Sequence, residues 1–284
     1  MASLRFPQLW DGCIYAICPS RDRSRSNIVT DFSGGNAVSS LVNMDPATDW
    51  VARAGGVALD LDVTNDYIQL PTAKYLMVTG RPFAVTWWER LASSVSFMAR
   101  FQLPTEGQSS GWIAFMSSSG SYTPISWSFT NGASGTGIRP SAGPTVASAV
   151  GVWRHWCITG SNATSAATAD HSIYIDGVDY ALTTGSSVND RVTARIGWDG
   201  SISGTNALID DVRIYSRRLM PSEAQLLSRR RGVAYEVKRS RIRQTVVTGG
   251  AGLEARIIHH AMGGSSAAQT GSWLKTSTGR AATY

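Results

Sequence analysis

The sequence predicts an all-β protein built as an antiparallel sandwich or barrel, and three observations lead to this fold class. Apolar and polar residues alternate with period two from about residue 55 to residue 215, as half-buried strands do. Only 16% of the 284 residues are charged, whereas about 25% is usual. The 28 glycines supply turns, and five glutamates are too few to cover the surfaces of long helices.

The strands are expected where the alternation is clearest. In residues 57–63, Leu59 and Leu61 share one face while Asp60 and Asp62 point to the other. The same pattern predicts further strands at 83–89, 95–101, 125–129, 173–175 and 192–196. Turn residues separate these runs, which favours antiparallel connections.

One short helix is predicted after the last strand. Pro221 fits the first helical position and Glu223 the first turn, where an acidic side chain suits the helix dipole. Leu226 and Leu227 supply a buried stripe, and three arginines precede Gly232, which ends the helix.

Charge divides the chain into two parts. Residues 1–212 hold 13 Lys and Arg against 17 Asp and Glu, a balance of −4, whereas residues 213–284 hold 13 against three, a balance of +10. We therefore expect a nearly neutral globular domain over residues 1–230 and an extended basic arm over residues 231–284.

The basic arm contains few large apolar residues and cannot bury a core alone. Its residues Arg239, Arg241 and Arg243 alternate with serine and isoleucine. This alternation favours a strand that adds to a neighbour's sheet over a phosphate-binding patch, so protein partners are expected rather than nucleic acid.

The three cysteines, Cys13, Cys18 and Cys157, have no disulfide-framework spacing. They are expected to be free, mostly buried thiols in a chain that folds in a reducing cytoplasm, with a Cys13–Cys18 disulfide as the alternative. The first residues lack the apolar segment of a signal peptide, and no apolar run approaches the ~20 residues of a membrane span. No membrane partner is expected.

Several stretches resemble the LamG-like jelly roll of the concanavalin A-like lectin/glucanase superfamily. The clearest is Ile-Asp-Asp-Val-Arg-Ile-Tyr-Ser at 209–216 with the helix start that follows it. Others, in the expected order, are residues 31–36, 58–68, 153–156, 174–177 and 196–198. The resemblance implies an antiparallel two-sheet jelly-roll sandwich with one short C-terminal helix. Met220 departs from it, because serine usually caps that helix.

Two further stretches, residues 41–50 and 229–236, resemble LamG-like proteins encoded among bacteriophage structural genes. This narrower resemblance implies a virion component made in the host cytoplasm, such as a capsid decoration, cement or surface-display protein. A homo-oligomer anchored to other virion proteins by the C-terminal arm is expected. A glycan-binding adhesin of the tail or fibre is the alternative, and a glycoside hydrolase comes third.

Catalytic residues are not expected. Glycanases need two carboxylates facing one groove, and the best match in spacing, Asp60 and Asp62, falls on a stretch that resembles non-catalytic strands of the family. The four histidines have no zinc-binding spacing, and neither a phosphate-binding loop nor a Gly-x-Ser-x-Gly nucleophile motif is present.

A structural calcium ion is the one cofactor considered. The resemblance places it between the opening loop, with Asp31 and Asn36, and Asp211 of the last strand, because Ca²⁺ takes several oxygen ligands. The alternative is that Asp210 and Asp211 pair with Arg213 or Arg217, or accept hydrogen bonds from the backbone.

Aromatic side chains that could stack on sugar rings are the candidates for a glycan site. They are Trp88, Trp112, Tyr122 and Trp198. Trp87 and Trp88 are neighbours in a strand, so they must project to opposite faces. The alternative for each is a place in the core or in an interface.

Overall fold

A computed structural model describes most of the chain and divides it into two compact units, Met1–Val237 and Lys238–Tyr284. The described residues are 4–34, 37–53, 56–62, 65–71, 77–78, 80–93, 98–104, 111–116, 126–130, 135–163, 167–185, 194–197, 206–237, 243–247 and 256–260. We call the first unit the body and describe each unit by itself.

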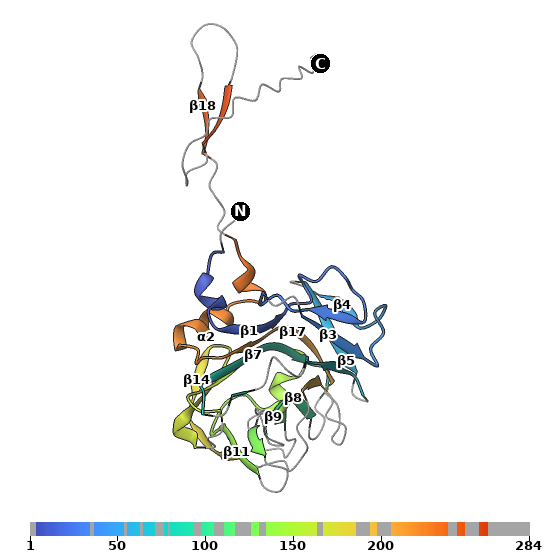
Figure 1. Cartoon of the computed structure of the whole chain (residues 1–284), viewed down its shortest axis with the longest axis vertical. Helices are drawn as coiled ribbons and strands as arrows, with labels where there is room; N and C mark the ends of the chain where they lie inside the picture. The colour runs from blue at the N-terminus through green and yellow to red at the C-terminus, as the bar shows by residue number, and fades with distance from the viewer. Residues whose placement is uncertain are drawn as a thin grey trace. The chain divides into compact units, whose positions relative to one another are not determined.

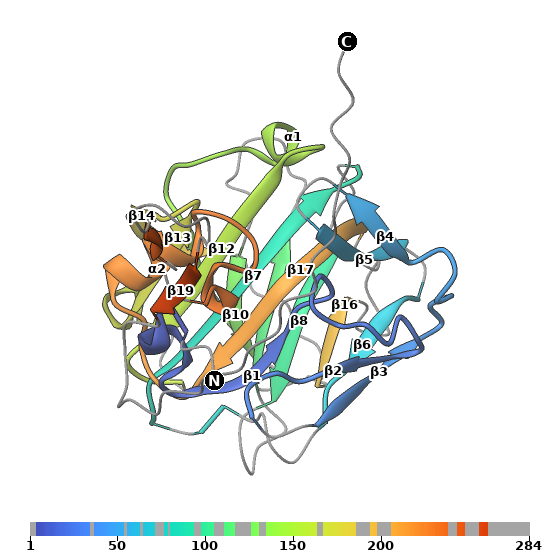
Figure 2. The ribbon, with the colours of Figure 1, turned by 90° about the horizontal axis from the view of Figure 1, so that it is seen from above.

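The body is a sandwich of two antiparallel sheets (Figure 1). Within the described residues, the first sheet has eight strands in the order β14-β13-β12-β7-β17-β5-β4, with β1 also paired to β17. The bounds are β1 Cys13–Ile17, β4 Trp50–Arg53, β5 Gly56–Asp62, β7 Phe83–Leu91, β12 Trp153–Gly160, β13 His171–Ile175, β14 Val178–Tyr180 and β17 Asn206–Tyr215. Figure 2 shows β12, β7 and β17 side by side, with β5 and β4 beyond β17.

The second sheet has nine strands among the described residues, in the order β15-β11-β10-β9-β8-β16-β6-β3-β2. Their bounds are β2 Ile28–Thr30, β3 Val38–Val42, β6 Tyr67–Gln69, β8 Met98–Pro104, β9 Gly111–Met116, β10 Ser126–Thr130, β11 Gly135–Pro140, β15 Leu182–Gly185 and β16 Arg195–Gly197. The prediction of an all-β, antiparallel two-sheet jelly roll is confirmed.

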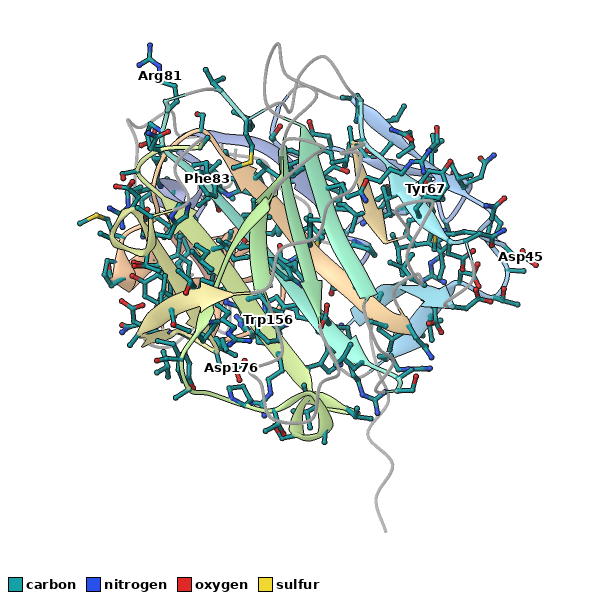
Figure 3. The ribbon with its side chains drawn as sticks, turned by 90° about the horizontal axis from the view of Figure 1, so that it is seen from below. Asp45, Tyr67, Arg81, Phe83, Trp156 and Asp176 are labelled. Carbon is teal, nitrogen blue, oxygen red and sulfur yellow. The ribbon has the colours of Figure 1, made fainter. Side chains whose placement is uncertain are left out.

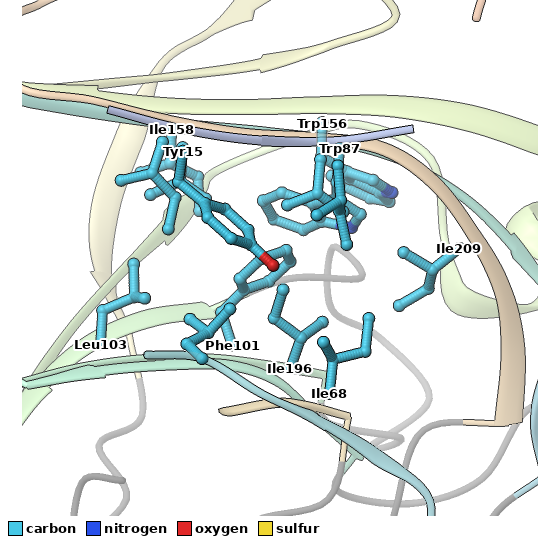
Figure 4. Close-up of a cluster of buried hydrophobic side chains, with 14 of the residues drawn as sticks. Tyr15, Ile68, Trp87, Phe101, Leu103, Trp156, Ile158, Ile196 and Ile209 are labelled. Atoms are coloured by element: carbon cyan, nitrogen blue, oxygen red, sulfur yellow. The ribbon is translucent and has the colours of Figure 1, made fainter. Parts of the chain in front are cut away.

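The core lies between the two sheets and follows from the period-two pattern. Trp87 and Trp156 project from the first sheet toward Phe101 of the second, with ring centroids of Trp87 and Phe101 4.6 Å apart (Figure 4). Ile196 and Ile68 complete the opposite wall, and all five side chains are fully buried. In Figure 3, Trp156 lies toward the interior, whereas Asp45 and Arg81 lie at the periphery.

β7 has a second apolar face because the first sheet is also covered on its outer side. The alternating residues Ala84, Thr86 and Trp88 are buried there just as Phe83 and Val85 are buried in the core. Trp87 and Trp88 thus occupy opposite faces, as expected from their adjacency.

The predicted helix is α2, Pro221–Leu227, and it begins at the predicted proline. The carboxylate of Glu223 accepts a hydrogen bond from the backbone N–H of Met220 at 2.9 Å, and Ala224 and Leu227 are buried. The short α1, Val146–Ala149, was not expected from the sequence. Three 3₁₀ helices complete the described helices: η1 Pro7–Trp10, η2 Thr168–Asp170 and η3 Val233–Tyr235.

The body ends at Val237, seven residues beyond the expected boundary at residue 230. The reason is that residues 231–237 are anchored to β17. Arg231 pairs with Asp210 at 3.2 Å, the backbone N–H of Gly232 donates to Asp211 at 2.8 Å, and Val233 is buried.

The described part of the second unit is an antiparallel hairpin of β18, Arg243–Val247, and β19, Arg256–His260. A strand was expected in this basic stretch, and Arg243 begins β18. Arg239 and Arg241 lie outside the described residues. Among the described residues, no helix has the length and apolar character needed to cross a bilayer.

Candidate functional site

The predicted glycan-binding aromatics are placed unevenly. Trp88 is described and is only 8% exposed, with its ring 5.3 Å from that of His155, so it offers little surface to a sugar. Trp112 lies in β9, where only the backbone is described. Tyr122 and Trp198 lie outside the described residues. The structure therefore brings none of the four to a described binding surface.

The predicted calcium ligands Asp31 and Asp211 are both buried and already hydrogen-bonded. Asp31 accepts from the backbone N–H groups of Ala16 at 2.9 Å and Ser33 at 2.8 Å. Asp211 pairs with Arg213 at 2.5 Å, which is the alternative considered from the sequence. The described residues include no group of three His, Cys, Asp or Glu that could hold a metal. Asn36 lies outside the described residues, so calcium stays a prediction.

Asp210, Asp211 and Arg213 form a buried polar cluster on the outer face of the first sheet. A bulge interrupts the pairing of β17 with β7 between Asp210 and Arg213, and Asp211 takes a left-handed backbone with φ of 48°. The Arg213 guanidinium lies 5.2 Å from the Trp10 ring and 4.9 Å from the Tyr235 ring. These aromatics cover the charge, as in cation–π contacts, and close the cluster to a ligand.

Burial, together with the neighbouring Asp211 carboxylate, raises the pKa of Asp210 to about 7 against the opposing charge of Arg231. The Asp210 carboxylate also accepts from Ser20 at 3.2 Å. Burial lowers the pKa of the nearby His155 to about 3, so its ring is neutral at pH 7. The cluster links β17 to Trp10 and to residues 231–235 of the body.

A hollow of about 470 Å³ lies where an edge of the first sheet meets β15 of the second. We call it the edge hollow. It is lined by Thr168, Ala169, His171, Ser172, Asp179, Tyr180, Ala181 and Leu182. Its size falls in the range of about 300–1,000 Å³ found for small-molecule sites.

The edge hollow combines an aromatic side chain with several hydrogen-bonding groups. Tyr180 is half-buried against the core, Ser172 and Thr168 supply hydroxyls, and the exposed Asp179 supplies a carboxylate. Burial lowers the pKa of His171, whose Nδ1 lies 3.0 Å from the carbonyl oxygen of Ala167. These groups can donate hydrogen bonds to the hydroxyls of a sugar and can accept hydrogen bonds from them.

No feature of the sequence predicts the edge hollow. Residues 174–177 stand out in the sequence only through the family resemblance, and Asp179 and Tyr180 follow them with ordinary strand spacing. Asp179 and Tyr180 lie near Thr168 and Leu182 because two sheets meet there, and a local sequence pattern does not reveal such a contact.

The proposed pair of acids, Asp60 and Asp62, lies on the outer side of β5 with Asp60 half-buried and Asp62 exposed. Asp62 donates its backbone N–H to the Asp66 carboxylate at 3.1 Å. Burial and the adjacent Asp62 raise the pKa of Asp66 to about 6, although a hydrogen bond from Asp62 lowers it. Asp62 thus has Asp66 as a hydrogen-bond partner, and this contact does not mark Asp60 and Asp62 as a catalytic pair.

Comparison with known families matches residues 62–225 to the family described as the concanavalin A-like lectin/glucanases superfamily. The match covers more than half of the chain. A comparison with curated proteins found no match.

Solved structures with the same fold include binding domains of bacterial toxins. The binding domain of Paraclostridial Mosquitocidal Protein 1 is 18% identical with a TM-score of 0.51, and 78% of this chain covers 52% of that one. The botulinum neurotoxin serotype D binding domain is 16% identical with a TM-score of 0.50 and the same coverage. Another structure of the serotype D domain, in complex with N-acetylneuraminic acid, is 15% identical with a TM-score of 0.50, and the match covers 78% of this chain and 52% of that one. The chain thus spans about half of their length, and the likeness concerns the fold.

Proposed function

This chain belongs to the concanavalin A-like lectin/glucanase superfamily, and from that premise we propose that it is a lectin-like, glycan-binding protein displayed on a bacteriophage virion. It acts by binding and not by catalysis. The jelly roll recognises the glycan, and the second unit attaches the protein to other virion proteins, with several copies assembling as a homo-oligomer.

The edge hollow is the observation that carries glycan binding. It places the Tyr180 ring beside two hydroxyls and the Asp179 carboxylate, which is the combination of an apolar surface and a few polar groups that orients a small polar ligand. The N-acetylneuraminic acid bound to the serotype D toxin domain supports a glycan as the ligand class.

A glycan array followed by affinity measurement tests this assignment. Asp179→Asn is expected to weaken binding of the best glycan at least about tenfold, because a hydrogen bond to a charged acceptor is worth about 1.5–3 kcal/mol. Val178→Ala is the matched control, since Val178 is exposed on the same strand and does not line the hollow. An array without any bound glycan, or unchanged binding by Asp179→Asn, would contradict the proposal.

Attachment through the second unit is supported by its charge and by its separation from the body at Val237. Residues 238–284 hold seven Lys and Arg against one Glu, a balance of +6, and this excess of positive charge suits an acidic partner. Removing residues 238–284 is expected to leave a folded body that no longer joins particles. Sedimentation of particles with full-length and truncated protein measures this, and full incorporation of the truncated protein would refute it.

A glycoside hydrolase is the third candidate, after a virion display protein and a glycan-binding adhesin, and the scarcity of paired acids argues against it. The best candidates, Asp60 and Asp62, differ in burial and lie beside arginines and a further aspartate. Release of reducing ends from a bound polysaccharide would overturn the non-enzymatic assignment.

A further inference from the structure

A second hollow, of about 260 Å³, lies on the outer face of the first sheet, away from the residues of the edge hollow. We call it the face hollow. Its lining includes Leu208, Arg53, Asp60, Arg90 and Gly151. The volume is just below the range of about 300–1,000 Å³ for drug-sized ligands, which suits one small ring.

Strand register brings the main groups of the face hollow into one row. Leu208 of β17 pairs with Asp60 of β5 on one side and with Arg90 of β7 on the other. Side chains directly opposite one another in adjacent strands share a face. The row therefore presents a carboxylate and a guanidinium on either side of an apolar residue, with Arg53 of β4 beside the carboxylate.

Arg90 is held in place by a small hydrogen-bonded frame. Its Nε donates to the carbonyl oxygen of Gly151 at 2.7 Å, and the backbone N–H of Gly151 donates to the carbonyl oxygen of Leu91 at 2.8 Å. Within the described part of the chain, the two Nη atoms of Arg90 make no hydrogen bond. A guanidinium fixed through Nε presents its remaining donors to a ligand with little loss of side-chain freedom.

Arg53 provides a second guanidinium at the end of β4. It is exposed, and its Nη1 donates only to the carbonyl oxygen of its neighbour Ala52 at 3.1 Å among the described residues. Neither Arg53 nor Arg90 lies within salt-bridge distance of a described carboxylate, Asp60 included. The hollow therefore holds two guanidinium groups, and neither of them forms a salt bridge with a described carboxylate.

Asp60 adds an acceptor to the same hollow. It is half-buried, and its electrostatic neighbours are Asp49, Arg53 and Asp62. A simple inorganic anion would be repelled by this carboxylate. A ligand that carries an anionic group and hydroxyl donors can satisfy both the arginines and the aspartate.

We propose that the face hollow binds a sugar acid, with its carboxylate on Arg90, its hydroxyls on Asp60 and Arg53 and its ring over Leu208. This is a site separate from the edge hollow, and it does not depend on glycan binding there. It makes the outer face of the first sheet selective for uronic-acid residues over neutral sugars.

Titration of the full-length protein with D-glucuronate, D-glucose and acetate, followed by NMR, tests the proposal. Glucose lacks only the carboxylate and acetate lacks the ring, so the two probes separate the parts of the recognition. Glucuronate is expected to bind at least about tenfold more tightly than either, since each charge-assisted hydrogen bond contributes strongly. Equal binding of glucose, or of acetate, would overturn the assignment.

Arg53→Met is the decisive variant, because Arg53 is exposed at a strand end, and among the described residues its side chain donates only to the carbonyl oxygen of its neighbour Ala52, so we expect the fold to tolerate its loss. It is expected to weaken glucuronate at least about tenfold, and Asp60→Asn is expected to weaken glucuronate without weakening acetate. Arg23→Met is the matched control, since Arg23 is equally exposed and lines neither hollow. Unchanged glucuronate binding by Arg53→Met would refute the site. Asp179→Asn reports on the edge hollow alone, so failure there leaves this result standing.

Discussion

At the residue scale, the burial of Arg213 explains several features of the last strand. Arg213 is fully buried, and removing a charge from water costs several kcal/mol unless opposite charge and hydrogen bonds compensate. The bulge in β17 and the left-handed backbone of Asp211 bring the Asp211 carboxylate to within 2.5 Å of the guanidinium. Trp10 and Tyr235 then cover it, which ties the two ends of the body together.

The pH dependence of stability should report on Asp210. Its pKa is about 7 in the folded chain and about 3.9 when unfolded. Between these values the folded chain binds more protons than the unfolded chain, so this group makes stability fall as pH rises. Asp210→Asn removes the titration. The free energy of unfolding of the wild type minus that of the variant is therefore expected to decrease from about pH 4 to pH 7 and to level off above it.

Urea denaturation of both proteins across this range measures that difference. Taking the difference cancels the groups that titrate in both proteins, such as Asp66 and Glu223. A difference that stays constant with pH would show that Asp210 is ionised throughout, with Arg231 compensating for its burial.

At the residue scale, the sequence predicted which charged residues pair better than it predicted which side chains are exposed. It included the Asp211–Arg213 pair among its alternatives, because oppositely charged residues two apart in a strand share a face. It also offered Trp88 as an exposed platform, although the structure buries it beside His155. Exposure depends on which segments cover the outer face of the sheet, and those segments come from distant parts of the sequence.

At the element scale, α2 begins without the usual side-chain cap. Met220 has the extended backbone of an N-cap residue, with φ of −72° and ψ of 153°, but its side chain is 63% exposed. Glu223 supplies one half of a capping box by accepting from the Met220 N–H, and Arg217 holds the Glu223 carboxylate at 2.7 and 2.8 Å.

Met220→Ser should therefore stabilise the protein. A serine oxygen would accept a hydrogen bond from a backbone N–H of the first turn, and little apolar burial is lost, so we expect a gain of about 1 kcal/mol. Thermal or urea unfolding compares the variant with Met220→Ala, which removes the methionine without adding a cap. Equal stability of the two variants would show that Glu223 already satisfies this helix end.

The strands follow the sequence pattern more closely than the helices do. β5 and β7 lie where the alternation predicts strands, and one face of each meets the same core, although the other face of β7 is buried as well. Helix α1 has four residues and a Thr145 cap, with Ser148 N–H donating to the Thr145 hydroxyl at 3.2 Å. So short an element has no periodicity to detect, and its position depends on the turn that leads to β12.

At the scale of the whole molecule, the cysteines report on the integrity of the body. All three are free and buried, as the sequence predicted. Burial raises the pKa of Cys13 to about 12 and also raises those of Cys18 and Cys157. The thiolate is the reactive form, so buried thiols are slow to react.

Native protein at about pH 8 is therefore expected to react slowly with a thiol reagent such as DTNB, and denatured protein to react at all three thiols. Spectrophotometric counting of released thiolate measures this. Removal of residues 238–284 serves as the comparison, because the three cysteines all belong to the body. Rapid reaction of the truncated protein would mean that the body needs the second unit for its packing.

The fold class, the positions of several strands such as β5, β7 and β13, and the start of α2 could be predicted from the sequence, because period-two alternation and helix-start residues act between near neighbours. The sequence predicts the division between a nearly neutral body and a basic C-terminal region at residue 230, and the body of the structure ends at Val237. The positions of the two hollows and of the buried polar cluster could not be predicted from the sequence, because they depend on contacts in the tertiary structure. Asp60, Leu208 and Arg90 are far apart in the chain and become neighbours through strand register. Register between distant strands is fixed by the packing of the whole sandwich, because only that packing decides which strands pair and which surfaces remain open.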